Sequence, residues 1–149
     1  MKPRAPWLGP ACRTLVLSWI LMAAACSGTP PEAALRQTIA DARDAAEKRD
    51  AASLKDTLAG DFVGPQGMDR QGLARMAQAV FLRHQGIDAT LGPLDIDMHG
   101  DAATVRFTAA VTGGNGLLPD TGQVYDVDTD WRLEDGEWRL VRANWKPQL

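Results

Sequence analysis

Apolar residues recur at helical spacing in the first segment after residue 30. Leu35, Ile39, Ala42 and Ala46 follow one another at intervals of four, three and four. This spacing places one apolar stripe along a helix from about Glu32 to Arg49, and the opposite face of the segment is charged. We therefore expect an amphipathic helix whose stripe packs on a core.

Short polar residues mark where this helix and two further helices begin. Thr29 and Glu32 have the spacing of a capping box, Asp50 can cap a second helix, and Asp69 precedes a third. Capping residues of this kind accept hydrogen bonds from the free backbone N–H groups of a first turn. Three helices are therefore predicted between residue 32 and residue 85.

The second and third helices differ in length and in apolar content. The second carries Leu54 and Leu58 and is expected to end at Gly60, before Phe62. The third is expected to run to about Gln85. Its predicted buried face contains Leu73, Met76, Ala77, Val80 and Phe81.

From Thr90 the apolar period changes from helical spacing to two, which is typical of half-buried strands. A first strand alternates Leu94, Ile96 and Met98 with polar residues, and Gly100-Asp101 turns the chain. The returning strand places four apolar residues on one face: Val105, Phe107, Ala109 and Val111. The stretch Gly113–Gly122 is expected to be a connecting loop, in which Leu117 and Leu118 could cover a pocket mouth or contact a partner.

The stretch DVDTDWRLEDGE, Asp126 to Glu137, fits two structures, a calcium loop and a β-hairpin. Acids stand at loop positions 1, 3 and 5 and Glu stands at position 12, but Trp131 occupies position 6, where a calcium loop needs glycine. Asp135-Gly136 is a strong two-residue hairpin signal. We therefore predict a hairpin and no metal site, with Asp126, Asp128 and Asp130 in a solvated row.

Extending the hairpin register predicts which side chains share a face. Trp131 falls opposite Leu140, and Thr129 falls opposite Arg142. The resulting apolar face collects Tyr125, Val127, Trp131, Leu133, Trp138 and Leu140. Its predicted polar positions are Tyr125, Thr129, Arg142 and Asn144.

The order of elements predicts an α+β fold with three N-terminal helices packed on a curved four-stranded antiparallel sheet. The 149 residues, 45% hydrophobic and 23% charged, suit one globular domain. No internal repeat interrupts this order.

The first 25 residues have the features of an export signal. Lys2, Arg4 and Arg13 precede the apolar run Thr14–Ala25, which is too short to span a bilayer. Small residues directly before Cys26 resemble the lipobox of bacterial lipoproteins, in which the cysteine is acylated and the peptide is cut ahead of it. We therefore expect a signal peptide over 1–25, a lipidated Cys26 with a short tether over 26–31, and one domain over 32–149. An ordinary cleaved signal or an uncleaved anchor is the alternative.

The absence of aspartate after Cys26 favours, by the same resemblance, the periplasmic face of the outer membrane. Both cysteines lie in or directly after the leader, so no disulfide is expected in the domain. Three of the 16 basic residues belong to the leader, which leaves 13 basic against 19 acidic residues in the mature part, a formal charge of −6. This balance disfavours binding to nucleic acid.

Two motifs, HGDAATVRF from His99 and DWRLEDGEWRLVRANW from Asp130, resemble the Gly-Asp turn and the closing hairpin of the nuclear transport factor 2-like (NTF2-like) superfamily. This superfamily also contains the SnoaL-like and ketosteroid isomerase-like proteins. The resemblance covers about Pro31 to Lys146 and implies a cone-shaped domain with a pocket on the concave side of its sheet. Enzymes of the superfamily place an acid or a histidine deep in that pocket.

The chain offers no strong candidate for such a catalytic group. His84 and His99 are expected at the surface or the rim, and four aspartates fit cap, loop or solvent-facing positions better: Asp61, Asp69, Asp95 and Asp97. No nucleophile set, metal cluster or phosphate loop is present in the sequence. We therefore expect no catalytic residue and no cofactor.

The leading hypothesis is an envelope lipoprotein whose domain binds a small apolar or amphipathic molecule or a protein partner. The expected ligand-binding residues are Tyr125, Thr129, Trp131, Arg142 and Asn144. Arg142 would need an anion, either an internal acid or a ligand carboxylate. A SnoaL-like isomerase or dehydratase, and a structural subunit of an envelope assembly, remain open as alternatives. The expected partners are the membrane, through the lipid on Cys26, and as further candidates an envelope protein and a second copy of the chain.

Overall fold

An amphipathic helix opens the structure, as the apolar spacing predicts. The computed structural model describes residues 30–114 and 121–148, and the helix, α1, spans Pro31–Glu47. Leu35 and Ile39 of its stripe are buried. The predicted signal peptide, the predicted lipidation site Cys26, the predicted cap Thr29 and the loop residues Leu117 and Leu118 lie outside the described residues.

The second helix is capped as predicted but is shorter. Asp50 accepts hydrogen bonds from the backbone N–H groups of Ala52 and Ser53, and α2 spans Ala51–Thr57. Leu58, predicted in this helix, instead begins the strand β1, Leu58–Val63. This strand pairs in parallel with a strand more than 70 residues later, with Leu58 opposite Leu140. Such a distant pairing leaves no local signal in the sequence.

The third helix begins where its cap predicts. After a short turn of 3₁₀-helix, Pro65–Gly67, Asp69 accepts a hydrogen bond from the N–H of Gly72. α3 then spans Arg70–Arg83 and ends two residues before the predicted position. Its predicted buried face is only partly covered, since Met76 and Val80 are 37% and 39% exposed.

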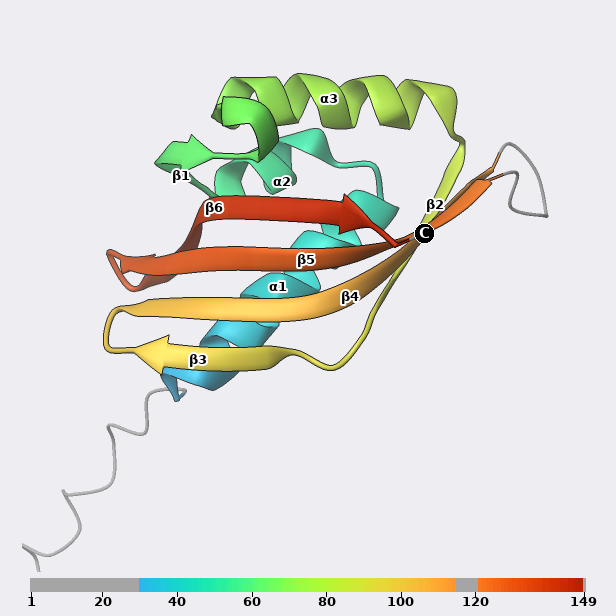
Figure 1. Cartoon of the computed structure of the whole chain (residues 1–149). Helices are drawn as coiled ribbons and strands as arrows, with labels where there is room; N and C mark the ends of the chain where they lie inside the picture. Colours follow the sequence, from blue (N-terminus) through green and yellow to red (C-terminus); the bar gives the residue numbers. More distant parts are fainter. Residues whose placement is uncertain (1–29, 115–120, 149) are drawn as a thin grey trace, which may run out of the picture. The chain divides into compact units, whose positions relative to one another are not determined.

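The remaining strands build one mixed sheet. They are β2 (Gly86–Leu91), β3 (Asp95–His99), β4 (Ala102–Gly114), β5 (Thr121–Glu134) and β6 (Glu137–Pro147). The order is β1-β6-β5-β4-β2, and β3 pairs with the other end of β4 (Figure 1). β1 runs parallel to β6 and the other pairs are antiparallel. The predicted α+β arrangement is confirmed, with β1 and β2 added to the four predicted strands.

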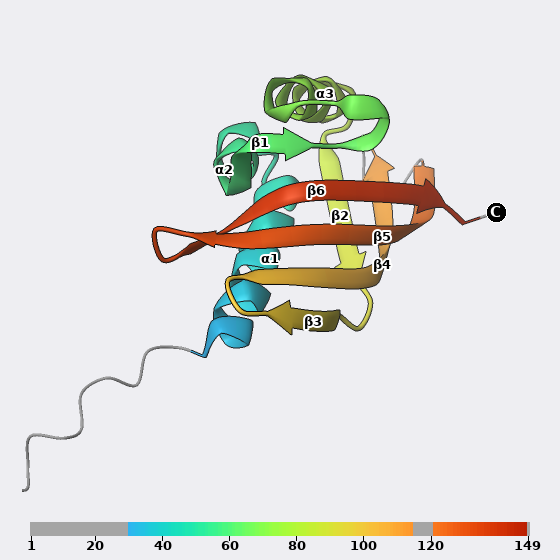
Figure 2. The same cartoon turned by 60° about the vertical axis from the view of Figure 1, so that its left-hand side comes forward.

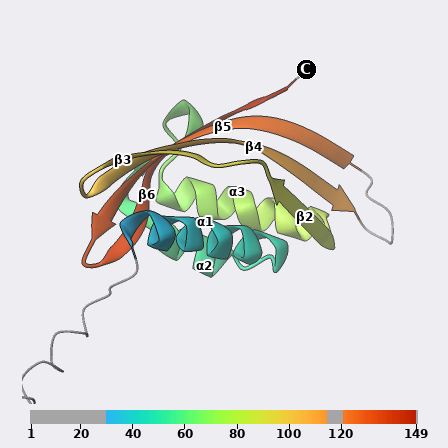
Figure 3. The same ribbon diagram turned by 90° about the horizontal axis from the view of Figure 1, so that it is seen from below.

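All three helices lie on one side of this sheet. Figure 3 shows the sheet curving over them, and Figure 2 shows the part of β4 and β5 next to β2 bending toward the helices. This curvature creates the concave side on which a pocket can form.

The closing hairpin turns at the predicted residues. Asp135 and Gly136 both have positive φ, 51° and 81°, which a two-residue turn of this kind requires. On the outer face of the sheet, Asp128 pairs with Arg106 at 3.3 Å. Within the described residues, no group of three or more His, Cys, Asp or Glu side chains is arranged to hold a metal ion. The hairpin is therefore confirmed for the stretch that also resembles a calcium loop.

The core lies between α1 and the hairpin end of the sheet. Trp131 and Trp138 are 5% and 3% exposed, and the indole N–H of Trp138 donates to the carbonyl of Pro31 at 3.0 Å. Both tryptophans belong to one buried cluster with Leu35, Ile39, Ala103 and Val105. A second cluster joins Leu58, Phe62 and Ala143 under β1 and β6. In the part of the chain that the structure describes, no helix is long and apolar enough to cross a bilayer.

Candidate functional site

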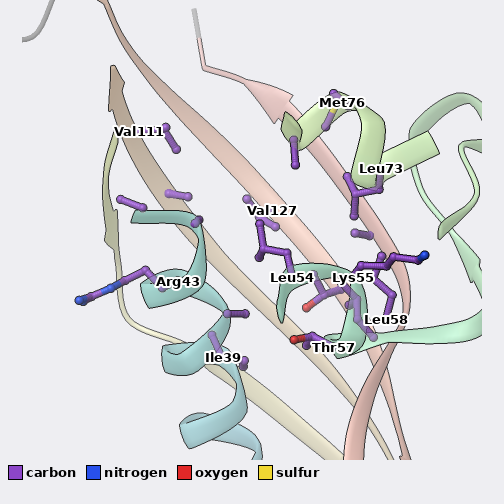
Figure 4. Close-up of a pocket in the computed structure, with 18 of the residues that line it drawn as sticks. Ile39, Arg43, Leu54, Lys55, Thr57, Leu58, Leu73, Met76, Val111 and Val127 are labelled. Atoms are coloured by element: carbon purple, nitrogen blue, oxygen red, sulfur yellow. The ribbon is translucent and has the colours of Figure 1, made fainter. Parts of the chain in front are cut away.

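A cavity of about 390 Å³ lies between the three helices and the concave face of the sheet. Figure 4 shows Ile39, Leu54 and Leu73 approaching it from the three helices, with Val111 and Val127 on the strands. Its volume falls within the usual range for small-molecule sites. The cavity is therefore the first candidate for a binding site.

Small side chains explain why this space stays open. Seven of the lining residues are alanine: Ala42, Ala46, Ala74, Ala77, Ala89, Ala109 and Ala143. Alanine methyl groups on both helix and sheet cannot reach across the gap that larger side chains would fill. The partial exposure of Met76 and Val80 follows, because the apolar face of α3 looks onto the cavity rather than onto packed side chains.

Arginines at both ends attach α3 to the other helices. At its start, Arg70 Nε donates to the carbonyl of Lys55 at 2.9 Å. At its end, Arg49 Nη1 donates to the carbonyls of Phe81 and His84, both at 3.4 Å. These bonds hold the ends of α3 to the α1–α2 layer while its middle spans the cavity.

The polar groups on the floor of the cavity satisfy one another. Thr129 is 6% exposed, and its hydroxyl donates to the carbonyl of Val105 at 3.0 Å. The same oxygen accepts the indole N–H of Trp131 at 2.9 Å. Because the one hydroxyl proton and the one indole proton are both used, the floor has no donor left for a ligand.

Two cationic side chains, Arg43 of α1 and Lys55 of α2, line the margin of the cavity. Figure 4 shows their nitrogen ends on opposite sides of the site. Among the described lining residues none is Asp, Glu or His, so the site lacks the carboxylate or imidazole that proton transfer usually uses.

The structure separates the five predicted ligand-binding residues. Trp131 and Thr129 line the cavity. Tyr125 is half-buried and is not among the lining residues. Arg142 and Asn144 are exposed.

The predicted position of Arg142 and Asn144 on the cavity wall is wrong because the β5–β6 register shifts by one residue. Trp131 pairs with Leu140 as predicted, but Asp130 then pairs with Arg142 and Thr129 with Ala143. The extra residue, Val141, forms a bulge that reverses the faces of all later residues in β6. Arg142 therefore lies on the outer face, where it pairs with Asp130 at 2.8 Å. Of the two anions expected for Arg142, an internal acid or a ligand carboxylate, the structure shows the internal acid, Asp130.

The candidate acids lie outside the cavity. Asp69 caps α3, and Asp95 and Asp97 are exposed on β3. Asp61 is exposed on β1, where two hydrogen bonds from the Arg132 guanidinium, at 2.8 and 3.3 Å, hold the pKa of this carboxyl below its usual value. Each of these aspartates therefore has a structural or solvent-facing position.

The two histidines differ from each other. His99 is exposed and lies 3.4 Å from a carboxylate oxygen of Asp97. His84, predicted at the surface or rim, is half-buried beside Gly113, and its Nδ1 is buried without a hydrogen-bond partner. Neither histidine is among the residues that line the cavity.

Sequence reasoning missed the helix side of the site. The helical spacing predicts Ala42 and Ala46 in a core stripe, and no pattern in the sequence distinguishes Lys55 from a surface lysine. The alanines on the apolar faces of α1 and α3 are the sequence feature that indicates this wall. Their side chains are too small to fill a core beneath a curved sheet.

No protein-family model matches the sequence, and no curated protein matches it. Solved structures do match. Bd1075 of Bdellovibrio bacteriovorus aligns with 76% of this chain at a TM-score of 0.68 and 16% identity, and the chain spans 40% of that protein. A candidate dehydratase of the NTF2-like family from Streptomyces avermitilis aligns with 78% of this chain and 95% of its own length, at a TM-score of 0.68 and 18% identity.

An NTF2-like protein with a cystatin-like fold from Novosphingobium aromaticivorans aligns with 76% of this chain and 79% of its own length. Its TM-score is 0.64 at 21% identity. These matches establish the NTF2-like fold that the two sequence motifs indicate.

Proposed function

We propose that this chain is an envelope lipoprotein whose NTF2-like domain binds a small apolar or amphipathic molecule without transforming it. The observation that supports this most is the cavity of about 390 Å³, whose described lining residues include no carboxylate and no imidazole. Such a wall favours an apolar ligand and lacks the carboxylate or imidazole that most often transfers a proton.

The energetics of an apolar cavity also support an occupant. The cavity is partly open to solvent, so its apolar walls face water when no ligand is bound. An apolar ligand would remove that surface from water and stabilise the fold.

The proposed location at the outer membrane rests on the first 26 residues and Ser27. The basic start, the apolar run Thr14–Ala25 and the small residues before Cys26 support export and acylation of the cysteine. Two or more acyl chains on Cys26 would hold the domain at the membrane, since one chain alone binds only marginally. The residue after the cysteine, Ser27, supports the outer membrane as the destination.

A dehydratase or isomerase on the same cavity is the second candidate. Its support is the likeness in fold to the candidate dehydratase from Streptomyces avermitilis. Proton transfer usually relies on a carboxylate or an imidazole, and the described lining residues include neither. The first proposal therefore fits the residues of the site better.

Identification of retained molecules tests the binding function. The full-length protein would be purified from membranes beside an Ala109→Phe variant, whose phenyl ring should occupy the cavity, and organic extracts of both would be compared by mass spectrometry. We expect an apolar compound near one mole per mole in the unaltered protein and far less in the variant. Equal amounts in both samples, or none in either, would contradict the proposal.

A further inference from the structure

One of the two cations at the cavity is already neutralised by its own helix. Arg43 Nη2 lies 3.0 Å from a carboxylate oxygen of Asp44 and 3.4 Å from one of Glu47. A guanidinium between two carboxylates has little charge left to offer a ligand. Arg43 is therefore a poor candidate for holding a ligand's polar end.

Lys55 is in the opposite situation. Its side chain is half-buried and lines the cavity, and among the described residues no carboxylate forms an ion pair with its ammonium. The neighbouring acid, Asp56, pairs instead with Arg70 at 3.4 Å. A lysine that lays its stem along an apolar wall and keeps its ammonium at the margin is suited to a molecule with an apolar body and an acidic end.

We propose that the ligand is an anionic amphiphile, such as a fatty acid, with its chain in the cavity and its acid group at the Lys55 ammonium. This inference rests on the proposed function and names the chemical class of its ligand. The floor has no free donor for an acid group, because the Thr129 hydroxyl donates to the Val105 carbonyl and the Trp131 indole donates to the Thr129 hydroxyl. The polar end must therefore remain at the margin, where the free charge is positive.

The negative net charge of the mature part opposes the binding of an anionic ligand. The salt concentration of the test therefore matters. A formal charge of −6, spread over the surface, repels an anion at low ionic strength. At about 0.15 M salt the Debye length is about 8 Å, so distant charges are screened while a contact with Lys55 is not. Binding should therefore be measured at physiological salt.

The test compares ligands that share one chain and differ in their head group. Dodecanoate, dodecanol and dodecylammonium would displace a neutral fluorescent dye, N-phenyl-1-naphthylamine, from the purified full-length protein. We expect dodecanoate to bind roughly three- to tenfold more tightly than dodecanol, and dodecylammonium to bind most weakly. Lys55→Gln should abolish the difference between acid and alcohol, and Lys55→Glu should reverse the order of acid and amine.

Arg43→Gln is the matched control, because it removes the same charge from the opposite margin. We expect it to leave the preference for dodecanoate within about twofold of the original. Equal binding of acid and alcohol in the unaltered protein would overturn the inference while leaving the proposed function standing. A preference that survives Lys55→Gln, or that Arg43→Gln removes instead, would also overturn it. Failure of the dye and all three ligands to bind would refute the proposed function itself.

Discussion

The indole N–H of Trp131 donates to the hydroxyl of Thr129, two residues earlier on β5, across 2.9 Å. That hydroxyl in turn donates to the Val105 carbonyl of the neighbouring strand. Both N–H and O–H donors of these two side chains are therefore used within the protein. A ligand that reaches the floor meets apolar atoms and hydrogen bonds already made.

The Thr129 hydroxyl should matter for stability rather than for a reaction. Thr129→Val keeps the side-chain shape but leaves the buried indole N–H without its acceptor, which should lower the unfolding free energy by about 1–3 kcal/mol. Thr129→Ser retains the hydroxyl and is the control. Chemical denaturation measures both, and equal losses in the two variants would show that the hydrogen bond contributes nothing.

Trp138 should be among the largest single contributors to the core. It is 3% exposed and joins β6 to the start of α1 through its bond to Pro31. Trp138→Ala should cost about 3–5 kcal/mol, whereas Trp138→Phe, which retains most of the apolar area, should cost clearly less. Thermal unfolding compares the two, and an unchanged melting temperature for Trp138→Ala would contradict this packing.

Asp61 should stabilise the fold at neutral pH and lose this effect in acid. The hydrogen bonds from Arg132 lower the pKa of Asp61 in the folded state, so its contribution is complete above the unfolded value of about 3.9. The contribution disappears as pH falls through the lower, folded value. Asp61→Asn should therefore melt below the unaltered protein at pH 7, and the difference should shrink below about pH 4.

The control for this prediction is Asp88→Asn, a change of the same charge at an exposed position on β2. We expect Asp88→Asn to change the melting temperature less than Asp61→Asn does at pH 7. A difference between the Asp61 variant and the unaltered protein that is equally large at pH 3 and pH 7 would exclude linkage through Asp61.

Cys26 should carry the membrane anchor. Cys26→Ala should stop incorporation of a labelled fatty acid and move the protein from the membrane fraction to the soluble periplasmic fraction. Cys12→Ala, a change of the other cysteine in the sequence, should have neither effect. Unchanged labelling of the Cys26 variant would refute the lipoprotein proposal.

Local signals predicted the elements that short-range chemistry determines. Asp50 and Asp69 cap helices because their carboxylates accept from N–H groups two or three residues later. Asp135-Gly136 fixes the hairpin, because two adjacent residues with positive φ are needed there. The sequence does not predict β1, because this strand pairs with β6, far along the chain. The local preference of Leu58 for helix or strand carries no information on such a distant pairing.

The candidate site was predicted in part, and one residue explains the misplacement of Arg142 and Asn144. Thr129 and Trp131 were correctly placed on the concave face, but the bulge at Val141 reversed Arg142 and Asn144. Val141 is a β-branched residue of a kind common in regular strands, so the sequence does not show that it is unpaired. Strict alternation therefore predicts the wrong face for the residues after it. The helix wall was missed because the alanines that line it fit an ordinary helix face equally well.

The most direct test of the central claim is to fill the cavity from the sheet. Ala109 of β4 lines it, whereas the next residue, Ala110, points to the opposite face of the same strand. Titration of N-phenyl-1-naphthylamine would be compared among the unaltered protein, Ala109→Phe and Ala110→Phe, with Ala77→Phe filling the same space from α3. We predict saturable binding in the unaltered protein and in Ala110→Phe, and loss of binding in Ala109→Phe and Ala77→Phe with cooperative unfolding retained. Dye binding that persists in both cavity-filling variants, or that is absent from the unaltered protein, would contradict the account.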